Sequence, residues 1–82
     1  MAKTTPSDVL KMLADAFEAP PGSIGPDTQR DEIAGWDSMG ALALMAELDE
    51  RFGITLTADE SKKLRSVADV LALLKRNDAL AE

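Results

Sequence analysis

The sequence predicts an all-α fold: a small antiparallel four-helix bundle with three long helices, one short helix and a long first loop. Three segments repeat apolar residues with a helical period, and none alternates apolar and polar residues long enough to predict a sheet. The chain has 82 residues, which suits a single domain over residues 1–82. Helical segments joined by short connections, apart from the first, are typical of such a bundle.

The first helix is expected over about residues 6–18. Thr5 is a good N-cap, and Pro6 suits the first helical position because its missing N–H would have no partner there. One apolar stripe follows at helical spacing: Leu10, Leu13, Ala14 and Phe17. The run Pro20-Pro21-Gly22 then prevents the helix from continuing, because proline lacks a backbone donor.

The connection from Ala19 to Trp36 is long and contains three prolines and three glycines. Connections longer than about 12–15 residues are uncommon in compact domains and are often functional. Two interpretations follow, a plain crossover between long helices or a binding loop, and we favour the crossover. Ile24 and Ile33 are its expected anchors in the core, and we expect Trp36 to anchor the loop as well.

The remaining helices are predicted from their caps. The second is expected over residues 38–52, with Asp37 as N-cap and Gly53 in the left-handed conformation after it. The third is expected over residues 58–64, because Thr57 and Glu60 form a capping-box pattern. The fourth is expected over residues 67–76, where Ser66 and Asp69 repeat that pattern and Lys75, Arg76 and Asn77 close the helix.

The second helix has two apolar faces when residues are placed about 100° apart around its axis. One face is a core stripe: Ala41, Leu44, Met45, Leu48 and Phe52. The other face holds Met39, Leu42 and Ala46, with Asp49 and Glu50 beside them. A small domain has one core, so either the third helix or the loop covers this second face, or the face is an exposed docking surface for a basic, apolar groove on a partner.

Composition excludes several functions. The chain has no Cys and no His, so it lacks a disulfide, a thiolate nucleophile and the usual general base, and we expect no enzyme. A metal site of Asp31, Glu32 and Asp37 is disfavoured because no His or Cys completes it. The net charge of −6 argues against nucleic acid, and no apolar run approaches the ~20 residues of a membrane span. The opening residues lack a signal-peptide pattern, so we expect a cytoplasmic protein. The solvated charges predict a monomer.

The segment Gly35-Trp36-Asp37-Ser38-Met39 opens an amphipathic helix that ends Phe52-Gly53-Ile54. This pattern, placed after a long proline-rich loop, resembles the acyl carrier protein family over most of the chain, from about residue 7 to residue 77. The resemblance implies a carrier rather than a catalyst. It implies that Ser38 receives 4′-phosphopantetheine from coenzyme A through a phosphodiester, and that the thiol of this arm holds acyl or aminoacyl groups as thioesters.

The resemblance also implies roles for the neighbours of that serine. Asp37 would cap the helix and help the phosphopantetheinyl transferase and its Mg²⁺ to engage. Met39 would lie where partners and the arm make contact. The further partners implied are an acyl- or aminoacyl-loading enzyme and a synthase, ketosynthase or other tailoring enzyme. The expected partner surface of the second helix consists of Leu42, Ala46, Glu47, Asp49 and Glu50.

The sequence departs from a fatty-acid synthase carrier just after the serine. Such carriers have acids two and five residues beyond it, whereas this chain has Gly40 and Ala43. We therefore expect a discrete carrier of a specialised pathway, of polyketide, peptide or hybrid type. Glycine within a helix costs about 1 kcal/mol relative to alanine, so Gly40 also indicates a close approach to the first turn.

Two questions stay open at this point. An unmodified four-helix interaction module that acts through the surface of the second helix is the alternative function. Leu42, Ala46, Ile54, Leu56 and Val67 either line an inner pocket for cargo or simply pack together.

Overall fold

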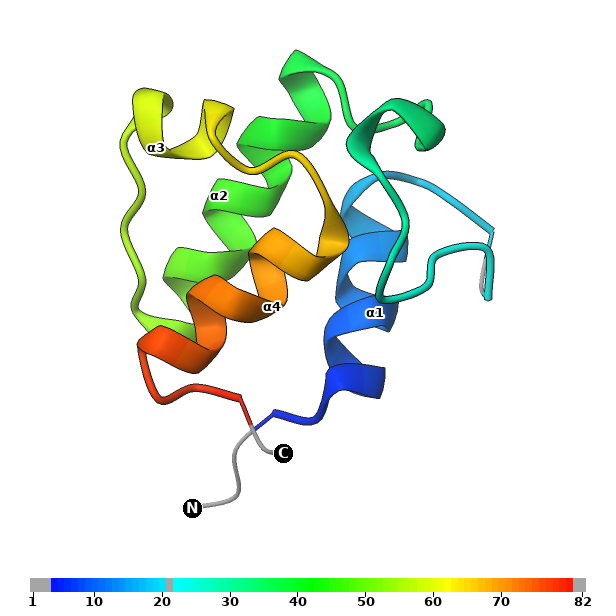
Figure 1. Cartoon of the computed structure of the whole chain (residues 1–82). Coiled ribbons are helices and arrows are strands. Elements are labelled where there is room, and N and C mark those ends of the chain that lie inside the picture. Colours follow the sequence, from blue (N-terminus) through cyan, green and yellow to red (C-terminus); the bar gives the residue numbers. More distant parts are fainter. Residues whose placement is uncertain (1–3, 21, 81–82) are drawn as a thin grey trace.

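The computed structural model describes residues 4–20 and 22–80 of the chain and contains only helices and loops in these ranges (Figure 1). In chain order, the elements are α1 (Pro6–Ala16), a 3-10 turn η1 (Arg30–Glu32), α2 (Ser38–Phe52), α3 (Ala58–Lys62) and α4 (Val67–Arg76). This confirms the predicted all-α bundle of three long helices and one short helix. The turn η1, within the long connection, was not predicted.

Two helices are shorter than predicted. α1 ends at Ala16 rather than near residue 18 because Glu18 takes a left-handed conformation with φ 54°, and the Ala19 N–H donates to the Ala14 carbonyl at 2.8 Å. This closure satisfies the carbonyls at the helix end before the prolines are reached. α3 ends at Lys62 rather than near residue 64.

The predicted caps are present, with one difference at the start of α4. Thr57 Oγ1 accepts from the Glu60 N–H at 3.1 Å, and the Thr57 N–H donates to Glu60 Oε1 at 3.0 Å, which lowers the pKa of the Glu60 carboxyl. Ser66 Oγ accepts from the Asp69 N–H at 3.2 Å. The Asp69 carboxylate accepts from the Arg65 N–H at 2.9 Å rather than from Ser66, so this cap is not the reciprocal box that the pattern predicted.

The helices pack so that the end of α1 lies near the start of α2 (Figure 1). The long connection is held against the start of α4 by two backbone bonds: the Arg30 N–H donates to Arg65 O at 2.8 Å, and the Val67 N–H donates to Thr28 O at 2.9 Å. The connection is therefore an ordered crossover over its described part, with Ile24 and Ile33 buried in the core as expected.

The core is formed mainly by α1, α2 and α4, which supply the largest fully buried side chains: Val9, Leu13, Leu44, Leu48, Val67, Val70 and Leu74. Trp36 closes the end of this core beside the long connection. Its ring stacks on Phe17 with centroids 4.8 Å apart, and the Arg30 guanidinium carbon lies 5.6 Å from its centroid. Trp36 Nε1 has no hydrogen-bond partner among the described residues, so the buried ring anchors the long connection by packing, as predicted.

Truncating a side chain on the core face of α2 should lower the free energy of unfolding much more than truncating one on the outer face, which holds Met39, Leu42 and Ala46. Leu44→Ala removes a side chain with 0% exposure, so we expect a loss of about 2–5 kcal/mol in the free energy of unfolding. Leu42→Ala, on a residue that is 59% exposed, should change it by less than about 0.5 kcal/mol. Urea denaturation of both variants checks this, and equal losses would contradict the assignment of core and outer faces.

Candidate functional site

The candidate site is the start of α2, where Ser38 is the first helical residue and is exposed. The preceding residue, Asp37, is the N-cap that was predicted, and its Oδ1 accepts from the Gly40 N–H at 2.9 Å. This bond fixes the backbone on both sides of the serine. The Ser38 hydroxyl is therefore presented to solvent at a defined place on the surface.

Two glycines explain why the chain can turn here. A Cβ atom on Gly35 would lie 1.8 Å from the carbonyl oxygen of Phe17, and one on Gly40 would lie 1.9 Å from the carbonyl oxygen of Gly35. Neither backbone contact can relax by a side-chain rotation. The turn before Ser38 is thus packed directly on the end of α1, which confirms the close approach that Gly40 indicated.

The outer face of α2 is exposed rather than covered. Met39 is 75% exposed and Leu42 is 59% exposed, and they are the exposed large hydrophobic residues of the described part of the chain. Ala46, Asp49 and Glu50 are exposed on the same helix, so covering of this face by the third helix or the loop is wrong. Glu47 is half-buried and forms an ion pair with Arg51 one turn later.

A phosphodiester arm fits the start of α2. The accessible hydroxyl stands at the positive end of a 15-residue helix, where an anion is favoured by about 0.3–1 kcal/mol when exposed. Asp37 occupies the Gly40 N–H, and the N–H groups of Ser38 and Met39 have no partner within residues 4–20 and 22–80. These donors are available to the oxygens of a phosphate group.

The other acids near the site do not suggest a metal centre. Glu32 Oε1 accepts from the Gln29 N–H at 2.9 Å at the start of η1, and Asp37 caps α2. Across the described ranges, no three side chains of the His, Cys, Asp or Glu types are gathered so that they could hold a metal ion.

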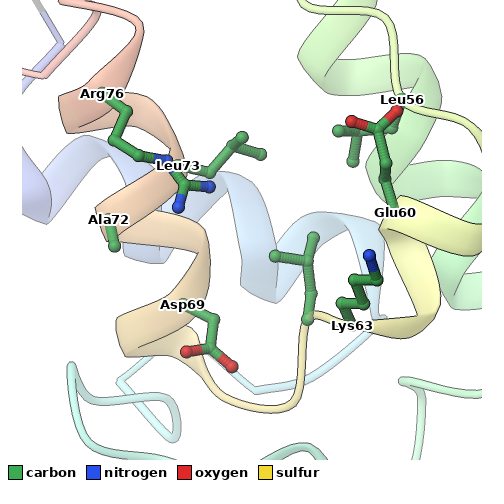
Figure 2. Close-up of a pocket in the computed structure, with 8 residues that line it drawn as sticks. Leu56, Glu60, Lys63, Asp69, Ala72, Leu73 and Arg76 are labelled. Carbon is green, nitrogen blue, oxygen red and sulfur yellow. The ribbon is translucent and has the colours of Figure 1, made fainter.

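A pocket of about 350 Å³ lies between α3 and α4 (Figure 2), and Ser38 is not among the residues that line it. Charged side chains surround its apolar floor: Glu60, Lys63, Asp69 and Arg76 stand around Leu56, Leu64 and Leu73. Of the five residues considered for an inner cargo pocket, Leu56 alone lines this space. Val67 is fully buried, Ile54 packs against the core, and Leu42 and Ala46 are exposed, so these residues do not share this pocket.

A second hollow, of about 450 Å³, lies beside Ser38 between the end of α1 and the start of α2, and we call it the α1–α2 groove. Its lining includes Asp37, Met39 and Glu47, which the sequence had singled out, and Asp15 and Glu18 of α1, which it had not. The sequence did contain a signal for Asp15 and Glu18: acidic residues lie at the end of α1, where basic residues are usual.

The described helices include none that is long and apolar enough to cross a bilayer.

Comparison with known proteins finds similarity over most of the chain. Residues 7–74 match the family described as "Phosphopantetheine attachment site". The chain is 30% identical over 69 residues to the acyl carrier protein of Rickettsia bellii (strain RML369-C), covering 84% of this chain and 80% of the relative. It is 30% identical over 71 residues to the acyl carrier protein of Thermosynechococcus vestitus, covering 87% and 88%. The acyl carrier protein of Helicobacter pylori (strain G27) is 23% identical over 70 residues, with 85% and 90% covered.

Proposed function

The chain belongs to the acyl carrier protein family, and we propose that it carries its cargo on Ser38. Proteins of this kind hold acyl groups as thioesters on a covalent 4′-phosphopantetheine, and this chain is such a carrier. Attachment at Ser38 is supported chiefly by one observation: an exposed hydroxyl is fixed at the start of α2, directly after the Asp37 cap.

The arm supplies a terminal thiol, which this cysteine-free chain does not have. On loading, the Oγ–phosphorus bond at Ser38 forms as the pyrophosphate bond of coenzyme A breaks, and the adenosine bisphosphate half leaves. The serine proton needs an acceptor. The chain has no His, and the Asp37 carboxylate already accepts the Gly40 N–H, so we place this base on the phosphopantetheinyl transferase.

The role of the protein after loading is to present the arm and to leave the chemistry to other enzymes. The absence of Cys and His from the scaffold suits a reactive thioester, because neither nucleophile nor imidazole base is close to it. We propose that an acyl- or aminoacyl-loading enzyme and a synthase, ketosynthase or tailoring enzyme of a specialised pathway use this carrier. The proposal that it acts as a monomer rests on its net charge of −6, because a net charge far from zero disfavours self-association. Its cytoplasmic location stays a prediction.

Incubation with coenzyme A, Mg²⁺ and a broad-specificity phosphopantetheinyl transferase tests this function. Intact mass spectrometry should show the wild-type chain gaining the mass of one phosphopantetheine unit. A chain that stays unmodified, while a known carrier is loaded in the same mixture, would support the unmodified interaction module instead.

Partner recognition is expected to use the outer face of α2 near the arm. This surface consists of Met39, Leu42, Ala46, Glu47, Asp49 and Glu50. Asp49 and Glu50 are exposed, so their contacts with a basic enzyme should be weak and screened by salt.

Asp49→Lys/Glu50→Lys is expected to lower the transferase's kcat/KM for attaching the arm to Ser38 by about tenfold at low salt, because reversed charges repel a basic enzyme during encounter. The wild-type kcat/KM should itself fall as sodium chloride is raised. Kinetics measured by mass at several salt concentrations check both effects. A wild-type rate that is independent of salt would show that electrostatic docking is the wrong account.

A further inference from the structure

The α1–α2 groove begins beside Ser38, because Asp37 and Met39, its two neighbours in sequence, both line it. Its uncharged lining includes Phe17 and Gly40, which are buried, Ala43, which is half-buried, and the exposed Met39. Its volume of about 450 Å³ is large enough to receive side chains of another protein. An enzyme that acts on Ser38 must cover the surface around that hydroxyl, and this groove is part of that surface.

The charge of the groove is all of one sign. Four carboxylates line it, those of Asp15, Glu18, Asp37 and Glu47, and none of its lining residues is Lys or Arg. Of the four, Glu47 is ion-paired with Arg51 and Asp37 caps α2. Asp15 and Glu18 form no salt bridge with any residue in the described ranges. The groove therefore favours a cationic occupant and disfavours an anionic one.

Asp15 and Glu18 are also unfavourable for the stability of the fold at their positions. They stand at the end of α1, where the partial negative charge of the helix favours cations, and α1 has no basic residue in its last turn. Glu18 has φ 54°, a conformation that glycine adopts more readily than any residue with a side chain. A sequence selected for stability alone would place glycine or lysine here. Such conflicts between local preference and structure are typical of functional positions.

We propose that the α1–α2 groove is a docking site for the enzyme that attaches the arm to Ser38, and that Asp15 and Glu18 receive basic residues of that enzyme while the exposed Met39 contacts an apolar one. This inference rests on the proposed attachment at Ser38. The occupant is the enzyme, because any enzyme that acts on Ser38 must lie against the surface beside it, and the four carboxylates of the groove favour basic side chains.

The test compares loading rates under the coenzyme A, Mg²⁺ and broad-specificity transferase conditions given above. Asp15→Lys/Glu18→Lys should lower kcat/KM by about tenfold, and its rate should depend less steeply on sodium chloride than that of the wild type. The matched control is Asp27→Lys/Asp59→Lys, which makes the same change in net charge at exposed acids outside the groove. It should stay within about twofold of the wild type.

Glu18→Gly separates docking from folding. Glycine adopts the left-handed conformation of residue 18 without strain, and the substitution removes a negative charge at the negative end of α1. The melting temperature of the variant should therefore rise. Its loading rate should nevertheless fall about threefold, because one carboxylate of the groove is lost. If the variant were slower only because its fold was damaged, its melting temperature would fall together with its rate of modification.

Failure of this inference is distinguishable from failure of the proposed function. If the wild type is not modified, attachment at Ser38 is wrong. If the wild type is modified and Asp15→Lys/Glu18→Lys is loaded at the same rate with the same salt dependence, the groove is not the docking site.

Discussion

Ser38→Ala is expected to abolish modification of the chain completely. The substitution removes the one oxygen to which the phosphorus is proposed to bond, and no neighbouring group can replace it. The fold should be unaffected, with the free energy of unfolding changed by less than about 0.5 kcal/mol, because Ser38 is exposed and the capping bond belongs to Asp37. Intact mass after exhaustive incubation with coenzyme A and transferase provides the measurement.

Ser23→Ala is the matched control, since Ser23 is also exposed and lies outside α2. It should gain one phosphopantetheine unit as the wild type does. Equal modification of Ser38→Ala and the wild type would contradict the assignment of the site.

Gly35→Ala should be strongly destabilising, although it adds only one methyl group. The added methyl would lie 1.8 Å from the carbonyl oxygen of Phe17 and 2.7 Å from its carbonyl carbon, so the backbone of α1 or of the turn must move. Overpacking typically costs about 1–3 kcal/mol and occasionally more, and we expect at least about 3 kcal/mol here because no side chain can yield. For a domain of this size, that lowers the melting temperature by roughly 12–24 °C.

Gly25→Ala controls for the loss of glycine itself. A Cβ there meets Thr28 Oγ1 at 3.7 Å, an ordinary contact, so its melting temperature should change little. Thermal unfolding followed by circular dichroism compares the two variants. If Gly35→Ala melts within a few degrees of Gly25→Ala, the turn before Ser38 does not pack as closely as described.

The local parts of the fold and site were predictable because neighbouring residues decide them. The cap and the serine are adjacent, so Asp37 and Ser38 could be placed at the start of a helix from the sequence. The left-handed Gly53, with φ 67°, followed from a glycine at the end of an apolar helix. The exposed Met39 and Leu42 followed from the helical period, although only the structure could show that no other element covers them.

The parts that were missed depend on contacts between distant residues. The bonds that hold the long connection to α4 join residues about 35 apart in sequence, such as Arg30 and Arg65. The turn η1 is the exception, because its bonds join residues three apart, such as Gln29 and Glu32. The α1–α2 groove arises because two glycines let the turn before α2 pack on α1, and that brings Glu18 beside Met39. No periodicity within one helix carries this information.

Trypsin offers the most direct measurement of where the arm is attached. Cleavage after Arg30 and Arg51 releases the peptide 31–51, in which Ser38 is the only residue with a hydroxyl group. After loading of the wild-type chain, mass spectrometry of the digest should find the phosphopantetheine unit on this peptide and on no other. An unmodified 31–51 peptide from a loaded chain, or the unit on a peptide that contains another serine, would contradict the assignment of Ser38 as the point of attachment.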